Sequence, residues 1–448
     1  MKTAIITSFA LILAASAFGQ NSLSLKQAKE LAIKNNVSIK NSLLEIEAAK
    51  QVKKNAFTNY FPKISVSAFA MKAKDPLIKY NMPGGNLPVY DGNPANLHLA
   101  TQFAYFPGAN IQMLDKTTLG LMNVTQPLFV GGKIVNGNKL AKIGVIVKEG
   151  QQKMTRNDVL LKTEQQYWQV LSLQEKQKTI EKYEALLLDI NKQVSDAYKS
   201  GLIIKNDLLK VSIKQSELQA NKNKLQSGKK LAIMQFCQTI GMSYDSLLVL
   251  QEDLQKIESP QSFFVQTESA MQNRIEYQLL EQSVKAQELQ TKMKTGDYLP
   301  QVAVGATGYY NNNLIKDVDG TKNGLLYATI SIPITDWWGG SYAIKEQKIK
   351  KQITENTLNE TKGLLKLQME KGWMDINVNY RQILLMEETL KQADENLKVS
   401  QDGYKNGIVT LSDLLEAQAL QAEIADKLID AKTQYYLAVY TYLQYTAR

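Results

Sequence analysis

A tandem repeat constrains this chain more than any other feature of its sequence. Seven residues recur in the same order at a constant spacing of 206 positions: Asp196, Tyr198, Lys199, Gly201, Asp207, Leu208 and Leu209 correspond to Asp402, Tyr404, Lys405, Gly407, Asp413, Leu414 and Leu415. Two further landmarks precede each set. One is a Tyr-x-Pro triplet at residues 60–62 and 298–300, and the other is a proline with a Gly-Gly pair a few residues later, Pro127 with Gly131-Gly132 and Pro333 with Gly339-Gly340. The chain is therefore expected to fold as two similar structural repeats, at residues 20–250 and 251–448.

Each repeat is predicted to contain a helix, two strands and a long helical hairpin. Apolar residues with helical spacing occupy residues 25–60 in the first copy and 278–298 in the second. Apolar and polar residues alternate with a period of two after each Tyr-x-Pro triplet, and they alternate again before the next proline. This pattern predicts four strands in all, each of about ten residues.

The long helices are indicated by proline-free stretches at residues 134–196 and 342–402, which correspond to about 90 Å of helix each. A coiled-coil seam with steps of three and four runs along the first of them: Ile180, Tyr183, Leu187, Ile190, Val194 and Ala197. A glycine turn follows each stretch, and the chain then returns as an antiparallel helix. One apolar stripe is expected on the second return helix: Ala417, Leu420, Ile424, Leu428, Ala431 and Tyr435.

The N-terminal residues 1–19 have the layout of a cleaved secretory signal. Lys2 precedes an apolar run, and small residues follow at 15–17 and 19. The run is shorter than the roughly 20 residues that span a bilayer, so we expect export, with the mature chain beginning near Gln20. The net charge of +10 comes from lysines interspersed with Glu and Gln along helices. This mixture is typical of a solvated helix surface, and we expect no nucleic-acid partner.

Nothing in the sequence indicates an enzyme. The one histidine, His98, lies in a predicted loop, the one cysteine, Cys237, lies in a predicted helix, and no nucleophile motif or phosphate-binding loop is present. We therefore expect no catalytic residues, no cofactor and no metal site.

Four strands cannot close a membrane barrel, because single-chain barrels begin at eight. Open strand edges are not tolerated in hydrocarbon, so other copies of the chain must complete the sheet. Three copies supply 12 strands around a water-filled pore, with the polar helices in the periplasm. The alternative is a periplasmic coiled-coil adaptor or scaffold, although such a protein would not need four alternating stretches at corresponding positions.

The order and duplication of these landmarks resemble those of the TolC-like outer-membrane efflux proteins over essentially the whole mature chain. The resemblance implies a mostly α fold with a membrane β-barrel: long coiled-coil-like hairpins and four strands per chain, forming a 12-stranded barrel and a helical tunnel as a homotrimer. It further implies a passive channel of a tripartite efflux or type I secretion system. The implied partners are outer-membrane lipid, a periplasmic adaptor (membrane fusion) protein and, through the adaptor, an inner-membrane pump.

Candidate gate residues lie beside the hairpin tips. Asp413 and Glu416 are three apart on one helical face and would form two carboxylate rings in a trimer; Asp207 and Asp413 are equally consistent with helix caps. The resemblance implies a closed entrance held by Asp207, Tyr404 and an arginine two residues after the tip glycine. Val409 occupies that arginine's position.

The remaining candidate sites are the hairpin tips, the strand exits, two tryptophans and one long loop. The resemblance implies adaptor contact at the tips: Ser200, Gly201, Leu202, Asn406, Gly407 and Ile408. The predicted strand exits, where the chain turns from strand to helix, contain Pro127, Gly131, Gly132, Pro333, Gly339 and Gly340. Trp337 and Trp338 are expected either at the membrane interface or packed inside. The long segment 73–118 is predicted to be an extracellular loop within the first repeat.

Overall fold

The computed structural model describes residues 22–448 except 313 and 316–317, so the predicted signal segment 1–19 lies outside the described residues. The chain divides into two compact units. The helical unit contains the described part of Met1–Lys50 together with Ile143–Lys285 and Gln352–Arg448, and the sheet unit contains Gln51–Lys142 and Ala286–Lys351.

Two very long helices dominate the chain, α4 (Lys133–Lys199) and α8 (Trp337–Lys405). Their 67 and 69 residues correspond to about 100 Å each. Each continues into a return helix, α5 (Lys205–Ile240) or α9 (Leu411–Tyr445), which confirms the two predicted hairpins. None of the helices in the described part of the chain contains an apolar stretch long enough to span a membrane.

Shorter helices precede the strands. The region predicted as one helix, 25–60, forms α2 (Leu25–Asn35) and α3 (Val37–Thr58), separated at Asn36. In the second copy, α6 (Thr267–Met271) is followed by α7 (Ile275–Gly296). The parallel pair β1 (Ser22–Leu23) and β8 (Val249–Leu250) connects the first described residues to the segment after α5.

The four long helices share one apolar core near the hairpin tips. Leu187, Ile190 and Val194 of the predicted seam are buried against Val211 and Leu218 of α5 and against residues of α8 and α9. The predicted seam is therefore confirmed. The predicted stripe on α9 is confirmed at four buried positions but is wrong at Leu420, which is 43 % exposed.

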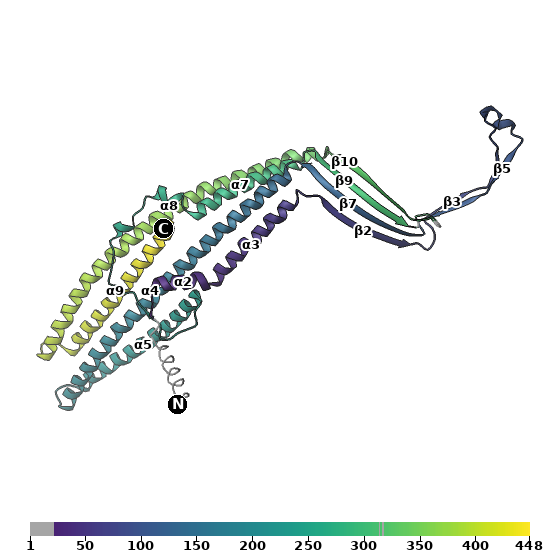
Figure 1. The fold of residues 1–448 in the computed structure, drawn as a ribbon. Coiled ribbons are helices and arrows are strands. Elements are labelled where there is room, and N and C mark those ends of the chain that lie inside the picture. Colours follow the sequence, from purple (N-terminus) through teal and green to yellow (C-terminus); the bar gives the residue numbers. More distant parts are fainter. Residues whose placement is uncertain (1–21, 313, 316–317) are drawn as a thin grey trace, which may run out of the picture. The chain divides into compact units, whose positions relative to one another are not determined.

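The sheet unit contains one four-stranded antiparallel sheet in the order β10-β9-β7-β2 (Figure 1). Its strands are β2 (Lys63–Lys72), β7 (Lys116–Val130), β9 (Gln301–Asn312) and β10 (Thr321–Ser331), in agreement with the four predicted strands. Within the described residues, the edge strands β2 and β10 each have a strand neighbour on one side only.

Segment 73–118 is more structured than the loop that the sequence predicts. It forms the antiparallel pair β3 (Ile78–Met82) and β6 (Ala109–Met113), and then the pair β4 (Gly85–Pro88) and β5 (Phe103–Phe106). A 3-10 helix, η1 (Pro94–Leu99), lies between β4 and β5.

Candidate functional site

The two faces of the four-stranded sheet have different chemistry. The strand register places twelve apolar residues or glycines on one face: Ile64, Val66, Ala68, Gly120, Met122, Val124, Val302, Val304, Ala306, Leu326, Ala328 and Ile330. Several of these side chains are largely exposed, with Val66 at 75 % and Leu326 at 87 %. A continuous exposed surface of this kind fits hydrocarbon rather than water.

The opposite face carries hydrogen-bonded polar side chains. The Thr307 hydroxyl donates to the Asn123 side-chain oxygen at 2.8 Å, and the hydroxyls of Thr125 and Tyr327 are 3.0 Å apart. These bonds connect β7 to β9 and, across β9, to β10. The separation is not complete, since Gln126 and Lys322 share rows with the apolar set, and the opposite face also carries apolar residues such as Leu121. The first face is thus predominantly apolar across its centre, and these hydrogen bonds lie on the other face.

The first strand exit differs in detail from its prediction. β7 continues past Pro127 to Val130, and the bulge between Pro127 and Phe129 accommodates the missing backbone donor. Gly131 and Gly132 then adopt positive φ angles of 64° and 73° before α4 begins. A Cβ on Gly131 would lie 2.1 Å from the Gly296 carbonyl oxygen, so the end of α7 requires glycine here.

The second strand exit uses its glycines in another way. Pro333 follows β10, whereas Gly339 and Gly340 lie within the first turn of α8 and do not form the predicted turn between strand and helix. Gly340 allows the Tyr298 ring to approach, because a Cβ there would lie 2.8 Å from the ring. The Trp337 indole donates to the Tyr298 carbonyl at 2.9 Å, and Trp338 is 81 % exposed.

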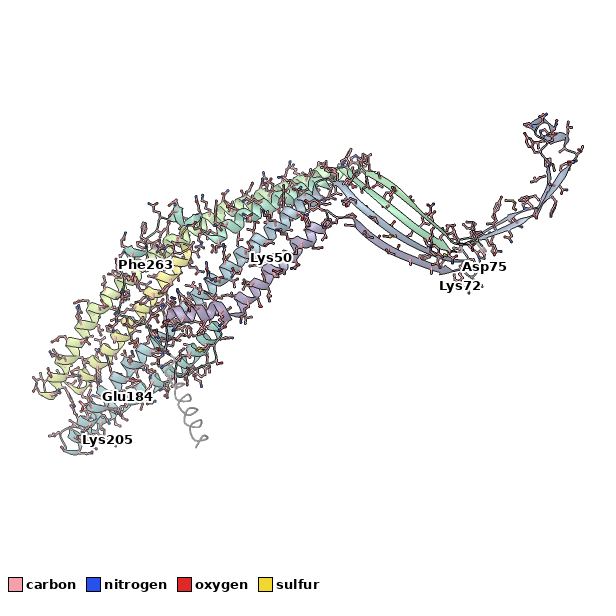
Figure 2. The ribbon with its side chains drawn as sticks, in the orientation of Figure 1. Lys50, Lys72, Asp75, Glu184, Lys205 and Phe263 are labelled. Carbon is pink, nitrogen blue, oxygen red and sulfur yellow. The ribbon has the colours of Figure 1, made fainter. Side chains whose placement is uncertain are left out.

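The two hairpin tips are built alike. At the first, the Leu202 amide donates to the Ala197 carbonyl and Gly201 has φ of 71°; at the second, the Ile408 amide donates to the Gly403 carbonyl and Gly407 has φ of 70°. Both are Schellman motifs, which close a helix with a left-handed glycine. The apolar residue after each glycine remains outside, with Leu202 78 % exposed and Ile408 81 % exposed. Figure 2 labels Lys205, where α5 begins just after the first tip.

Three of the four elements at the tips meet around Asp207. Burial, and then the negative charge of Asp207, raise the pKa of the Tyr404 hydroxyl on α8, so these two predicted gate residues are neighbours. Lys210 on α5 contacts the Asp207 carboxylate at 3.4 Å and donates to the Ser412 hydroxyl on α9 at 2.9 Å. Lys210 is not among the predicted gate residues, because its spacing from Asp207 gives no indication of the contact with α9.

The other two predicted gate residues have separate environments. Asp413 closes a capping box at the start of α9: its carboxylate accepts from the Thr410 hydroxyl at 2.7 Å, and its amide donates back to that hydroxyl. Glu416 is exposed and borders a groove of about 330 Å³ together with Lys210 and Lys214. Of the two predicted gate acids, Asp413 is therefore a helix cap, and Glu416 is a carboxylate that faces a lysine-rich groove.

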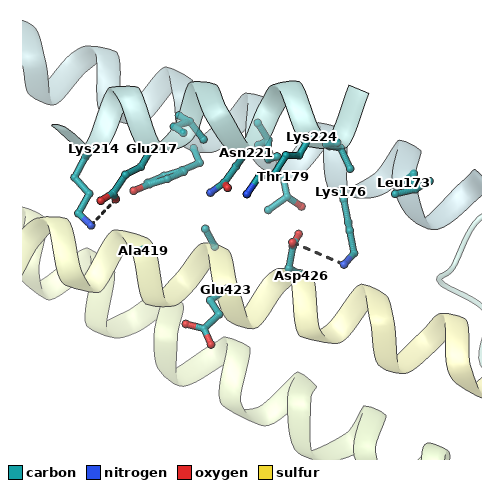
Figure 3. Close-up of a pocket in the computed structure, with 15 residues that line it drawn as sticks. Leu173, Lys176, Thr179, Lys214, Glu217, Asn221, Lys224, Ala419, Glu423 and Asp426 are labelled. Carbon is teal, nitrogen blue, oxygen red and sulfur yellow. Dashed lines mark hydrogen bonds and ion pairs between the residues drawn. The ribbon is translucent and has the colours of Figure 1, made fainter. Parts of the chain in front are cut away.

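A larger cavity, of about 540 Å³, lies farther from the tips between α4, α5 and α9 (Figure 3). Its charged residues include Lys176, which contacts Asp426 at 3.9 Å and Asp430 at 2.8 Å. Burial raises the pKa of the Asp426 carboxyl, whose Oδ1 has no hydrogen-bond partner among the described residues. The part of the chain that the structure describes has no cluster of three or more His, Cys, Asp or Glu side chains arranged to hold a metal ion.

Comparison with known proteins identifies one family. Residues 267–446 match the model of the outer membrane efflux protein family. Among curated proteins, none matches this chain significantly. The family match covers the second helical hairpin and the strands β9 and β10.

Solved structures share the fold over almost the whole chain. VceC, an outer membrane protein from Vibrio cholerae, has 13% identity and a TM-score of 0.74, covering 94% of this chain and 96% of its own. The CmeC outer membrane channel of Campylobacter jejuni has 15% identity and a TM-score of 0.73, covering 94% and 85%. The open state of the MtrE outer membrane channel of Neisseria gonorrhoeae has 11% identity and a TM-score of 0.72, covering 94% and 88%.

Proposed function

We infer that this chain, whose residues 267–446 belong to the outer membrane efflux protein family, is a passive channel subunit of the outer membrane. The observation that carries the inference is the four-stranded sheet, which has two open edges, one predominantly apolar face and one face with hydrogen-bonded polar side chains. The apolar face suits lipid, and the polar face suits a water-filled lumen. A periplasmic scaffold, the alternative function, has no use for such a sheet.

The open edges require partners of the same kind. In lipid, the unpaired backbone groups of β2 and β10 must be satisfied by other strands. Three copies joined edge to edge form a closed barrel of 12 strands. The chain is then a homotrimer whose helices form a tunnel on the periplasmic side.

The hairpin tips are the contact site for an adaptor protein. Leu202 and Ile408 present apolar side chains next to glycines whose Cβ positions are open, so another backbone can approach closely. The adaptor links the channel to an inner-membrane pump, and small molecules pass from the pump through the tunnel. Tip residues Ser200, Gly201, Asn406 and Gly407 shape the two turns.

The gate lies at the same end of the helical hairpins. Asp207 and Tyr404 lie close together on the two hairpins of one chain, and Glu416 contributes a carboxylate that favours cations at the entrance. Asp413 supports this arrangement by fixing the first turn of α9.

The test is the detergent-corrected mass of the particle extracted from the outer-membrane fraction. The inference expects three copies of the chain, in particles that conduct ions in planar bilayers. A soluble periplasmic monomer or dimer would overturn it and support the scaffold.

A further inference from the structure

The segment between β2 and β7 forms a two-stranded ribbon whose inner half is amphipathic. The register of β3 and β6 places six apolar residues on one face: Ile78, Tyr80, Met82, Ala109, Ile111 and Met113. The other face carries only polar side chains, Lys79, Asn81, Asn110 and Gln112. We call the first of these the apolar ribbon face.

The outer half of the ribbon begins at a break that affects both strands. Pro83-Gly84 and Pro107-Gly108 interrupt the two strands, and a Cβ on Gly84 would lie 2.6 Å from the Gly108 amide nitrogen. Proline cannot donate to the ladder, and glycine lets the two backbones touch. Beyond the break, exposed aromatic residues lie on both faces of the pair β4 and β5, with Phe103 (57 % exposed) and Tyr105 (71 % exposed) on one face and Phe106 (42 % exposed) on the other.

The ribbon is poorly suited to isolation in water. From Ile78 to Leu114 the sequence contains only two formal charges, Lys79 and Asp91, and neither lies on the apolar ribbon face. On the apolar ribbon face, Ile78 is 47 % exposed and Tyr80 is 59 % exposed. A lone two-stranded ribbon is marginally stable, so the apolar ribbon face needs a covering surface.

The position of the ribbon indicates what covers it. β3 follows β2, which is an edge strand of the sheet and therefore lies at the seam with a second copy. The base of the ribbon is fixed by the Leu114 amide, which donates to the Leu314 carbonyl at 3.0 Å. Twelve tilted strands enclose a barrel of radius about 12 Å, whereas the eleven residues from Ile78 to Pro88 can extend about 36 Å. Ribbons from three copies are thus long enough to meet at the barrel axis, and the apolar ribbon face carries no charge that would repel the same face of another copy.

We propose that the ribbons of the three copies pack against one another through their apolar ribbon faces, at the outer mouth of the channel. This inference rests on the proposed trimeric channel. Each apolar ribbon face is covered by the same face of a second copy. The outer half of the ribbon can bend at the break at Pro83-Gly84.

The test uses neighbouring residues on opposite faces of β3. Tyr80→Cys and Asn81→Cys are introduced separately into the full chain carrying Cys237→Ala, which removes the one native thiol. The assembled protein is treated in outer membranes with a short bis-maleimide and separated on a denaturing gel. Tyr80→Cys is expected to give linked copies several-fold more strongly than Asn81→Cys. Ile111→Cys and Asn110→Cys repeat the comparison on β6, in case one variant fails to assemble.

Three outcomes would overturn the inference while leaving the channel intact, provided that the particle keeps the mass of a trimer. One is equal linking from both faces, and another is no linking from either apolar position. The third is protection of Tyr80→Cys from a polar maleimide without any linking, since a different molecule would then cover the face. A particle of any other mass would instead overturn the proposed function itself.

Discussion

At the scale of single residues, Gly131 and Gly339 occupy corresponding motifs but different backbone environments. Gly131→Ala places a Cβ against the Gly296 carbonyl in a left-handed conformation, and we expect a loss of about 3 kcal/mol and a lower Tm. Gly339→Ala is the matched control, because its Cβ meets open space within a helix; a gain of up to about 1 kcal/mol is expected. Thermal unfolding of the detergent-extracted particle measures both. Equal Tm values for the two variants would contradict the steric argument.

The acidic residues near the tips differ in whether their contacts can be predicted from local sequence. Two interpretations of Asp413 were open from sequence, a helix cap or a member of a carboxylate ring, and the structure places it in a capping box with Thr410. Asp207 occupies the same position in the repeat, yet Ile204 precedes its helix and offers no side-chain oxygen. Asp207 therefore contacts Lys210 instead. Local sequence predicted the cap, whereas the contact between Lys210 and Ser412 depends on how two distant helices pack.

At the scale of elements, Lys210 connects one hairpin to the other within a chain. Lys210→Gln should weaken the contacts with Asp207 and Ser412 and make separation of α5 from α9 easier. An exposed contact of this kind is worth about 0.5 kcal/mol, so three copies together should raise the open fraction about tenfold. Single-channel recording in planar bilayers measures the resting conductance.

Two further variants make this prediction specific. Lys214→Gln should leave the resting conductance unchanged, because Lys214 pairs with Glu217 on its own helix. Lys210→Arg should restore the low resting conductance, since it keeps a charged donor. If Lys214→Gln opens the channel as much as Lys210→Gln does, general loss of charge near the tips is the cause, and the specific connection is refuted.

The elements also differ in how readily they can be predicted. The long helices were evident because no proline interrupts them and their apolar residues recur at steps of three and four. β3 to β6 were missed, since strands of four or five residues separated by Pro-Gly pairs resemble a loop in sequence. Their identity as strands depends on pairing across the ribbon, which leaves no local signal.

At the scale of the whole molecule, the surfaces of the sheet and of the helices suit different surroundings. The helices carry lysines and acids along exposed surfaces, whereas one face of the sheet is predominantly apolar across its centre. The repeat gives each chain two equivalent strand pairs and two equivalent hairpins. Three such chains therefore provide six similar units, which suits a closed ring around one pore.

The direction in which the sheet faces can be tested with adjacent residues of β2. Val66→Lys adds a charge to the apolar face, at a cost of about 2–4 kcal/mol per copy if that face meets lipid near the midplane. Ser67→Lys adds the same charge to the opposite face, where it would reach the water of the lumen. We expect Val66→Lys to reduce sharply the yield of trimer in the outer-membrane fraction, and Ser67→Lys to assemble normally but conduct cations less well. Normal assembly of Val66→Lys with failure of Ser67→Lys would mean that the polar face is buried and the apolar face is not the lipid surface.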